Sequence, residues 1–174
     1  MLLVWKDIMQ CLPESRLLLK NSALADDAAA LEIHSRLMKL GMDMDRIVLE
    51  AASEDYMDRY LDVDIALDTY PYTGGGTTCE ALYMGVPVIS RYGHRRGTRF
   101  GWSILEHAGL GELAAADMVG YKAKVLALAG DREILGALHR NLRKMMLASS
   151  LMDTNQYVQS VESSLLQIWQ KERL

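Results

Sequence analysis

The residues best suited to chemistry are Gly74, Gly75, Gly76, Thr77 and Thr78, which follow one another without interruption. They come after a short apolar run and open a helical pattern, so we expect a turn between a strand and a helix. Glycines allow the backbone to approach a ligand closely, and the free N–H groups of a first helical turn can donate to a phosphate, as can two hydroxyls. The sequence predicts a phosphate-binding loop; a tight turn that simply needs small residues is the alternative. The glycine stretch has neither the G-x-G-x-x-G spacing nor the lysine of a Walker motif.

Three further features surround this loop. Glu80 lies close behind the glycines, where its carboxylate could accept a hydrogen bond from a sugar hydroxyl. Tyr56 and Arg59 stand three residues apart, so on a helix they would share a face and could offer a ring and a cation to a nucleotide base; a solvated surface pair is the alternative. The segment 91–99 concentrates positive charge that could face phosphates or an acidic partner, or could simply be solvated: Arg91, His94, Arg95, Arg96 and Arg99.

Apolar periods, capping residues and chain breakers predict an alternation of helices and strands. Ser53 is expected to cap the helix that follows it, and Pro87 to mark an edge strand or the first residue of a strand. The predicted helices span 2–12, 28–40, 53–61, 77–84, 98–108, 121–129, 131–146 and 154–171, and the predicted strands 16–20, 46–49, 64–68 and 86–90.

Strands that alternate with helices pair in parallel through right-handed crossovers. The sequence therefore predicts an α/β fold: a Rossmann-like, doubly wound parallel sheet with helices on both faces. A helical C-terminal extension should end in a long helix packed back across the domain. Ligands of such sheets bind beyond the carboxyl ends of the strands, which selects three loops: 50–54, 69–78 and 91–99.

Composition narrows the class of protein. The chain has 174 residues, half of them apolar, which suits one globular domain. A net charge of −4 argues against nucleic acid or an anionic membrane as the main partner. Two cysteines are too few for a disulfide framework, and the sequence has neither a CxxC motif nor a Cys/His cluster to hold zinc. Both observations favour a cytoplasmic location. The chain opens directly on an amphipathic helix, so we expect a fragment whose preceding strand has been left out.

A longer block of sequence resembles a known family. The residues from Asp64 to Val88, together with Ile47 to Leu49 and the tail from Leu151 to Trp169, resemble the C-terminal catalytic half of the protein O-GlcNAc transferases and their SPINDLY-like relatives. That family has the GT-B architecture, in which two Rossmann-like domains hold a sugar nucleotide between them, usually after tetratricopeptide repeats. The resemblance implies that residues 1–174 form a single domain, the C-terminal GT-B nucleotide-sugar-binding domain, without its first strand.

The resemblance also assigns roles to residues. It places Ala51 and Ser53 by the base and ribose, and Tyr56 and Arg59 around the uracil. Gly74 opens the ligand loop. By the same resemblance, Gly75, Gly76, Thr77 and Thr78 would lie along the diphosphate, and Glu80 would form a hydrogen bond with the ribose. The chain departs from the animal enzymes at three positions: it has Gly75 in place of a histidine, Ser53 in place of a lysine and Glu80 in place of an aspartate. The family's phosphate-binding lysine would lie just before residue 1.

The activity implied is transfer of GlcNAc from UDP-GlcNAc to serine or threonine of proteins, by a full-length glycosyltransferase. UDP or UDP-GlcNAc would be the ligand of this half, with no metal and no other cofactor. The acceptor protein would bind through N-terminal segments, so the isolated chain should be inactive. The alternative is an inactive sugar-nucleotide-like domain that serves as a protein-interaction module through segment 91–99 and the C-terminal helix. Neither nucleic acid nor a membrane is an expected partner.

Overall fold

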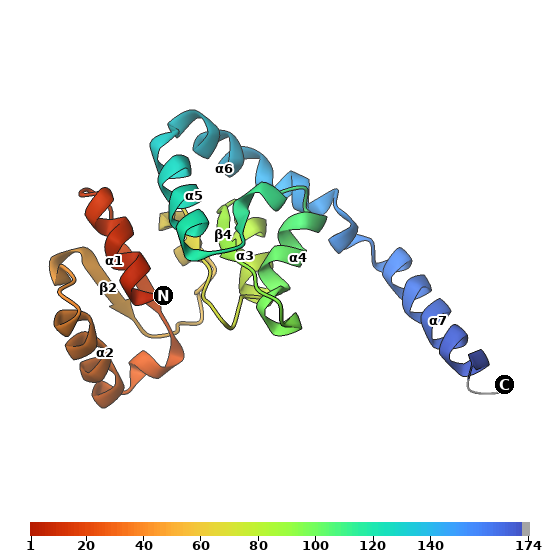
Figure 1. Cartoon of the computed structure of the whole chain (residues 1–174), viewed down its shortest axis with the longest axis horizontal. Coiled ribbons are helices and arrows are strands. Elements are labelled where there is room, and N and C mark those ends of the chain that lie inside the picture. Colours follow the sequence, from red (N-terminus) through yellow and green to blue (C-terminus); the bar gives the residue numbers. More distant parts are fainter. Residues whose placement is uncertain (172–174) are drawn as a thin grey trace.

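Short parallel strands lie between two layers of helices (Figure 1). The computed structural model describes residues 1–171, and residues 172–174 lie outside the described part. The strands are β1 (Leu17–Lys20), β2 (Ile47–Glu50), β3 (Ala66–Leu67), β4 (Val88–Arg91) and β5 (Ala114–Ala115). The α-helices are α1 (Leu2–Cys11), α2 (Asp27–Lys39), α3 (Gly76–Tyr83), α4 (Phe100–His107), α5 (Met118–Gly130), α6 (Arg132–Leu147) and α7 (Thr154–Lys171). The predicted α/β alternation is confirmed.

All strand pairs are parallel, as predicted, but they form two sheets. In the first, β1 pairs with β2, with Leu17 opposite Ile47 and Lys20 opposite Glu50. The second has the order β3-β4-β5, so β4 is its central strand. Within residues 1–171 no hydrogen-bonded ladder joins β1 to β3. The Rossmann-like arrangement is therefore present with one break in the middle of its sheet.

Helices cover both faces of the strands, as expected. The alternation of side chains along a strand sends Ile89 to one face and its neighbour Val88 to the other. Buried residues of α1, α2 and α5 form the core on the first face with Ile89: Trp5, Ile8, Met9, Leu37, Tyr121, Val125 and Leu128. Buried residues of α3, α4 and α6 form the core on the second face with Val88: Ala81, Leu82, Leu105, Leu142 and Met146.

The predicted helix from Ser53 to Leu61 is wrong. Turns cover residues 54–57, and a 3₁₀ helix (Asp58–Asp62) follows, with Met57 at its N-cap and no capping side chain. Ser53 therefore caps nothing. Arg59 bonds Glu50 of β2, a tertiary contact that outweighs weak helix propensity, and it pairs locally with Asp62 three residues along the chain.

Pro87 does not mark an edge strand, because the strand that it precedes, β4, has a neighbour on each side. It stands immediately before the first residue of β4, close to the other predicted position. Its carbonyl accepts a hydrogen bond from the Ala66 N–H at 2.9 Å. A proline can fill this place in a central strand because only its carbonyl has to pair.

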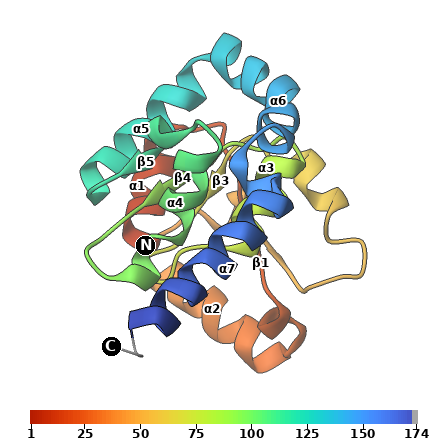
Figure 2. The same ribbon diagram turned by 90° about the vertical axis from the view of Figure 1, so that its right-hand side faces the viewer.

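Helix α7 does not pack back across the domain, contrary to expectation. It extends away from the body in Figure 1 and stands in front of it in Figure 2, and none of its residues is buried. Helices α1 to α6 already cover both core faces of the strands, so the cores form without it. Its exposed apolar side chains include Tyr157, Val161, Leu165 and Ile168. Among the helices of residues 1–171, none is long and apolar enough to cross a membrane.

Candidate functional site

The glycine loop, residues 69–78, connects β3 to α3 and is anchored at its start by Asp68. The Asp68 carboxylate is 8% exposed and lies directly after β3. Its Oδ1 accepts hydrogen bonds from the backbone N–H groups of Thr69 at 2.8 Å and Gly74 at 2.7 Å, and Ser90 Oγ donates to Oδ2. Burial raises the pKa of Asp68, while these three donors work in the opposite direction. Asp68 was not among the site residues predicted from the sequence. Its position at the end of a predicted strand, shortly before the glycines, is the signal that could have identified it.

The far end of the loop is closed by Thr78. Its hydroxyl donates to the Gly74 carbonyl at 3.1 Å, and the residue is 2% exposed. Of the two hydroxyls predicted to face a phosphate, that of Thr78 is thus used inside the loop, while Thr77 is exposed. Within the described chain the N–H groups of Gly75, Gly76 and Thr77 have no hydrogen-bond acceptor. These three amides are therefore available to a ligand at the N-terminus of α3.

The three glycines differ in their surroundings. A Cβ on Gly74 would lie 2.7 Å from the Oγ1 atoms of both Thr77 and Thr78, so this position requires glycine. A Cβ on Gly75 or Gly76 would meet nothing within 4 Å. The open space beside the loop therefore lies where its free amides are.

A second segment, residues 51–63, which we call the base-side segment, approaches α3 from the end of β2. Tyr56 donates its hydroxyl hydrogen to Glu80 Oε1 at 3.1 Å, and Tyr60 approaches Glu80 Oε2 at 3.5 Å. The hydrogen bond to Glu80 raises the pKa of Tyr56, and burial, reinforced by the Glu80 charge, raises the pKa of Tyr60 to about 12. The structure thus brings together Tyr56 and Glu80, two of the predicted site residues.

Arg59 is turned toward acidic side chains. Its Nε and Nη2 donate to Glu50 at 3.0 and 2.6 Å, and its Nη1 donates to Asp62. The hydrogen bond from Arg59 holds the pKa of Glu50 below its usual range. The cation predicted beside a base is therefore engaged with carboxylates, and no hydrogen bond joins it to Tyr56 in residues 1–171.

Lys20, which the sequence patterns did not indicate, lies beside Glu50, the first residue of the predicted ligand loop 50–54. Lys20 ends β1 and Glu50 ends β2, directly opposite each other in the parallel register. The Lys20 ammonium lies 3.5 Å from Glu50 Oε2 and donates to the Ala51 carbonyl at 2.9 Å. Ser53 is exposed near this edge and makes no hydrogen bond within the described residues. Lys20 could have been found by asking which polar residue ends the strand beside the one that Glu50 ends.

The basic segment 91–99 lies against the glycine loop. The Arg91 guanidinium sits 3.7 Å from the centre of the Tyr70 ring, and the Thr73 hydroxyl reaches the Gly97 carbonyl at 3.5 Å. Arg95 and Arg96 are exposed and have no ion-pair partner in the described part of the chain. Positive charge therefore lies at the same edge of the sheet as the free amides.

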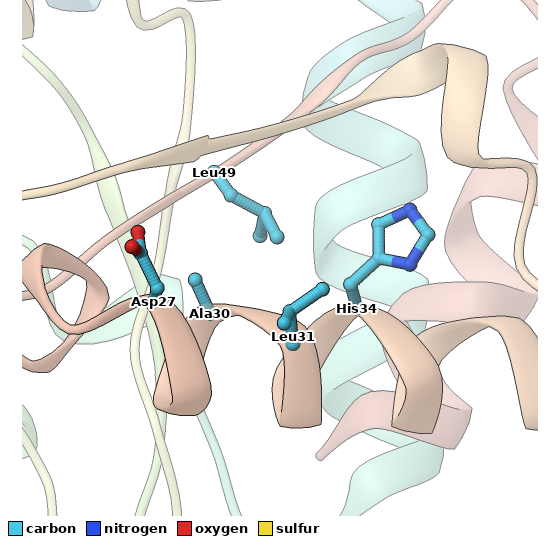
Figure 3. Close-up of a pocket in the computed structure, with 5 residues that line it drawn as sticks. All are labelled: Asp27, Ala30, Leu31, His34 and Leu49. Atoms are coloured by element: carbon cyan, nitrogen blue, oxygen red, sulfur yellow. The ribbon is translucent and has the colours of Figure 1, made fainter.

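A hollow of about 520 Å³ lies elsewhere, between α2 and β2 (Figure 3). Leu49 of β2 projects toward Ala30 and Leu31 of α2, with Asp27 and His34 at the ends of the gap. None of the predicted site residues lines it. The hollow is present because α2 packs loosely on the strands: Leu37 is the one buried residue of this helix. Within residues 1–171 no three His, Cys, Asp or Glu side chains cluster in a way that could hold a metal ion.

Comparisons with known proteins add to this geometry. Residues 1–161 match the model of glycosyl transferase family 41. A probable UDP-N-acetylglucosamine–peptide N-acetylglucosaminyltransferase SPINDLY of Petunia hybrida is 36% identical over 171 residues, and that of Hordeum vulgare is 35% identical. Each alignment covers 97% of this chain and 18% of the plant protein. A mutant of the O-GlcNAc transferase of Thermobaculum terrenum superposes with a TM-score of 0.90 at 32% identity, over 98% of this chain and 33% of that one.

Proposed function

Because the chain belongs to glycosyl transferase family 41, we propose that it is the UDP-sugar-binding half of a protein O-glycosyltransferase. The observation that carries the proposal is the set of free N–H groups of Gly75, Gly76 and Thr77 beside open space. They stand at the N-terminus of α3 and at the carboxyl end of a parallel sheet. That is where a doubly wound fold binds the phosphates of a nucleotide.

The sugar in this proposal is GlcNAc and the acceptor is a serine or threonine hydroxyl of a protein. The names of the plant relatives, which specify UDP-N-acetylglucosamine and a peptide, support this choice. In such a transfer, negative charge grows on the departing diphosphate. Backbone donors and the helix dipole already aimed at that position stabilise it without the reorganisation that water would need. The proposed reaction assigns no role to a metal.

The remaining predicted residues would serve the nucleoside. Glu80 would accept a hydrogen bond from a ribose hydroxyl, giving up its bond to Tyr56 or sharing it. Ala51 and Ser53 lie on the base side of the site, at the end of β2. Contact between Arg59 and the base would require the guanidinium to leave Glu50, so we propose that Tyr56 supplies the first contact with the uracil.

The chain spans 18% of the length of the plant relatives, so the activity of a whole protein is a proposal for this one. We propose that the isolated chain does not transfer sugar, since catalysis by positioning needs the other side of the cleft. Within residues 1–171, β1 and β3 each pair on one side alone, and this supports the further proposal that one more parallel strand joins the two sheets in the whole protein.

A second candidate function is favoured by helix α7. Its apolar residues, such as Val161, Leu165 and Ile168, are exposed, and none of the described residues of the helix is buried. A domain without activity could use this helix and the basic segment to bind another protein. Nucleotide binding separates the two candidates, because an interaction module does not need it.

Titration with nucleotides tests the proposed function. We expect the chain to bind UDP with a dissociation constant of roughly 0.1 to several mM, because half of the cleft retains part of the binding energy. UDP should bind more tightly than its dideoxyribose analogue, and Glu80→Ala should remove that difference. The matched control is Glu162→Ala, which changes an exposed carboxylate on α7. Absence of UDP binding, or an unchanged preference for ribose in Glu80→Ala, would contradict the proposal.

A further inference from the structure

Asp68 stands at the centre of a buried hydrogen-bond network. Its backbone N–H donates to the Ile89 carbonyl at 3.0 Å, and its own carbonyl accepts from the Tyr121 hydroxyl at 3.0 Å. The Tyr121 hydroxyl is in turn approached by Trp5 Nε1 at 3.4 Å. The main chain of Asp68 is thus fixed by β4 within the sheet and by Tyr121 of α5 from one face, and its carboxylate leaves β3 in a set direction.

That carboxylate is also confined by packing. A Cβ on Gly101, in the first turn of α4, would overlap Asp68 Oδ2 and Ser90 Oγ. Ser90 itself is fully buried in β4. The carboxylate therefore has one position, set by β4 and α4, and Oδ1 is aimed at the start of the glycine loop.

The glycine loop is tied to this fixed group at Gly74. Asp68 Oδ1 holds the Gly74 N–H at 2.7 Å, and Thr78 Oγ1 holds the Gly74 carbonyl at 3.1 Å. Both peptide groups flanking Gly74 are therefore fixed by side chains, and the free amides of Gly75 and Gly76 follow directly. Consecutive glycines lose more conformational freedom on ordering than other residues, so an untied loop would pay that cost on binding.

We propose that Asp68 is a positioning residue that holds the glycine loop in its nucleotide-binding conformation. This inference rests on the proposed function and deepens it, because it concerns how the proposed binding loop is held in place. In the described residues no lysine or arginine pairs with Asp68, and its partners are N–H and O–H donors. Its role is therefore to accept hydrogen bonds in a fixed geometry, and its negative charge is dispensable.

This distinction gives a pair of variants with opposite expectations. Asp68→Asn keeps the Oδ1 acceptor and places an amide that can donate to the Ser90 oxygen, so the loop should stay tied. Asp68→Ala removes every acceptor and leaves the N–H groups of Thr69 and Gly74 without one. The stability control is Asp117→Ala, which removes a carboxylate that accepts from the Gly120 N–H at 2.7 Å at the start of α5.

The experiment measures two quantities on the 174-residue chain: amide hydrogen exchange at Gly74 without ligand, and the dissociation constant of UDP by NMR titration. For Asp68→Ala we expect exchange at Gly74 to accelerate at least tenfold and UDP binding to weaken at least tenfold. For Asp68→Asn both should stay within threefold of the unsubstituted chain. For Asp117→Ala both should stay within twofold, whatever its melting temperature.

Three results would overturn the inference: unchanged exchange at Gly74 in Asp68→Ala, faster exchange with unchanged UDP affinity, or losses in Asp68→Asn equal to those in Asp68→Ala. If Asp68→Ala does not fold, Ser90→Ala takes its place, because it removes only the donor that fixes Oδ2. It should accelerate Gly74 exchange and weaken UDP binding about threefold, and no change in either contradicts the inference. If the unsubstituted chain does not bind UDP, the proposed function itself is refuted. If the unsubstituted chain and Asp68→Ala bind UDP equally well, only the inference about Asp68 is refuted.

Discussion

The two segments that border the candidate site are held by different forces. Gly74 of the glycine loop is tied to Asp68 and Thr78, and Asp68 in turn is held by Ser90; all three side chains belong to buried residues. The base-side segment is held by Arg59 and Glu50, whose side chains are 31% and 27% exposed. The side chains that tie one segment thus belong to buried residues, whereas the ion pair that ties the other is partly exposed.

This difference in anchoring predicts different responses of the two segments to salt and to a bound ligand. Buried hydrogen bonds are little affected by salt, and losing one partner leaves the other unsatisfied at a high cost. Exposed ion pairs are screened by salt and contribute little to stability. The glycine loop is therefore suited to present a fixed set of amides to phosphates. The base-side segment can rearrange around a nucleoside at low cost.

The largest effect should come from crowding the anchor of the glycine loop. Gly101→Ala would push its methyl group into Asp68 and Ser90, and overpacking of this kind costs about 1–3 kcal/mol. Urea denaturation should show this loss, with weaker UDP binding beside it. Gly97→Ala is the control, because a Cβ there meets nothing within 4 Å. Equal stabilities of the two variants would show that the anchor is not tightly packed.

A smaller effect is expected from cutting the surface anchor. Glu50→Ala removes the shared partner of Lys20 and Arg59 and should lower the melting temperature by about 1–3 °C in low salt. The difference from the unsubstituted chain should shrink in 1 M salt, where the Debye length is about 3 Å. Glu54→Ala, at an exposed position of the same segment, controls for lost charge. A salt-independent loss would mean that this anchor behaves like the buried one.

The pH dependence of stability should separate the anchors further. The pKa of Glu50 is lowered in the folded state, so its stabilising contribution is present above its unfolded value of 4.5 and is lost as the pH falls through the folded value. Asp68 has a raised pKa, so acid protonates it in the folded state first and relieves the cost of its buried charge. Melting curves from pH 3 to 7 should therefore show a flatter acid side in Glu50→Gln. If the melting temperature of Glu50→Gln fell more steeply in acid than that of the unsubstituted chain, the pKa of Glu50 would be raised in the folded state, contrary to this account.

The smallest effect should follow Tyr56→Phe. The hydroxyl lost is exposed and bonds only Glu80 within residues 1–171, so the melting temperature should change by less than about 1 °C. Affinity for UDP should change by less than threefold, because the ring remains. Tyr121→Phe is the buried counterpart, since its hydroxyl holds the Asp68 carbonyl, and should cost clearly more stability. Equal costs would remove the contrast between surface and interior.

The sequence was most informative where local chemistry decides the structure. The alternation of apolar runs was sufficient to predict parallel strands, and the glycines were sufficient to predict the turn between β3 and α3. Asp68 and the contact of Lys20 with Glu50 were missed because they depend on which strands lie side by side. The helix expected after Ser53 and the docking of α7 were wrong for a related reason: contacts between distant residues decide both.

The central claim is that the amides of the glycine loop bind the diphosphate of UDP. Its most direct test is a map of amide chemical-shift changes on the isotope-labelled 174-residue chain during titration with UDP, UMP and pyrophosphate. The account predicts that UDP shifts Gly75, Gly76 and Thr77, that UMP shifts fewer of them, and that magnesium is not needed. Shifts that fall instead on Arg95 and Arg96, and that pyrophosphate alone reproduces, would contradict it and show a general anion-binding patch.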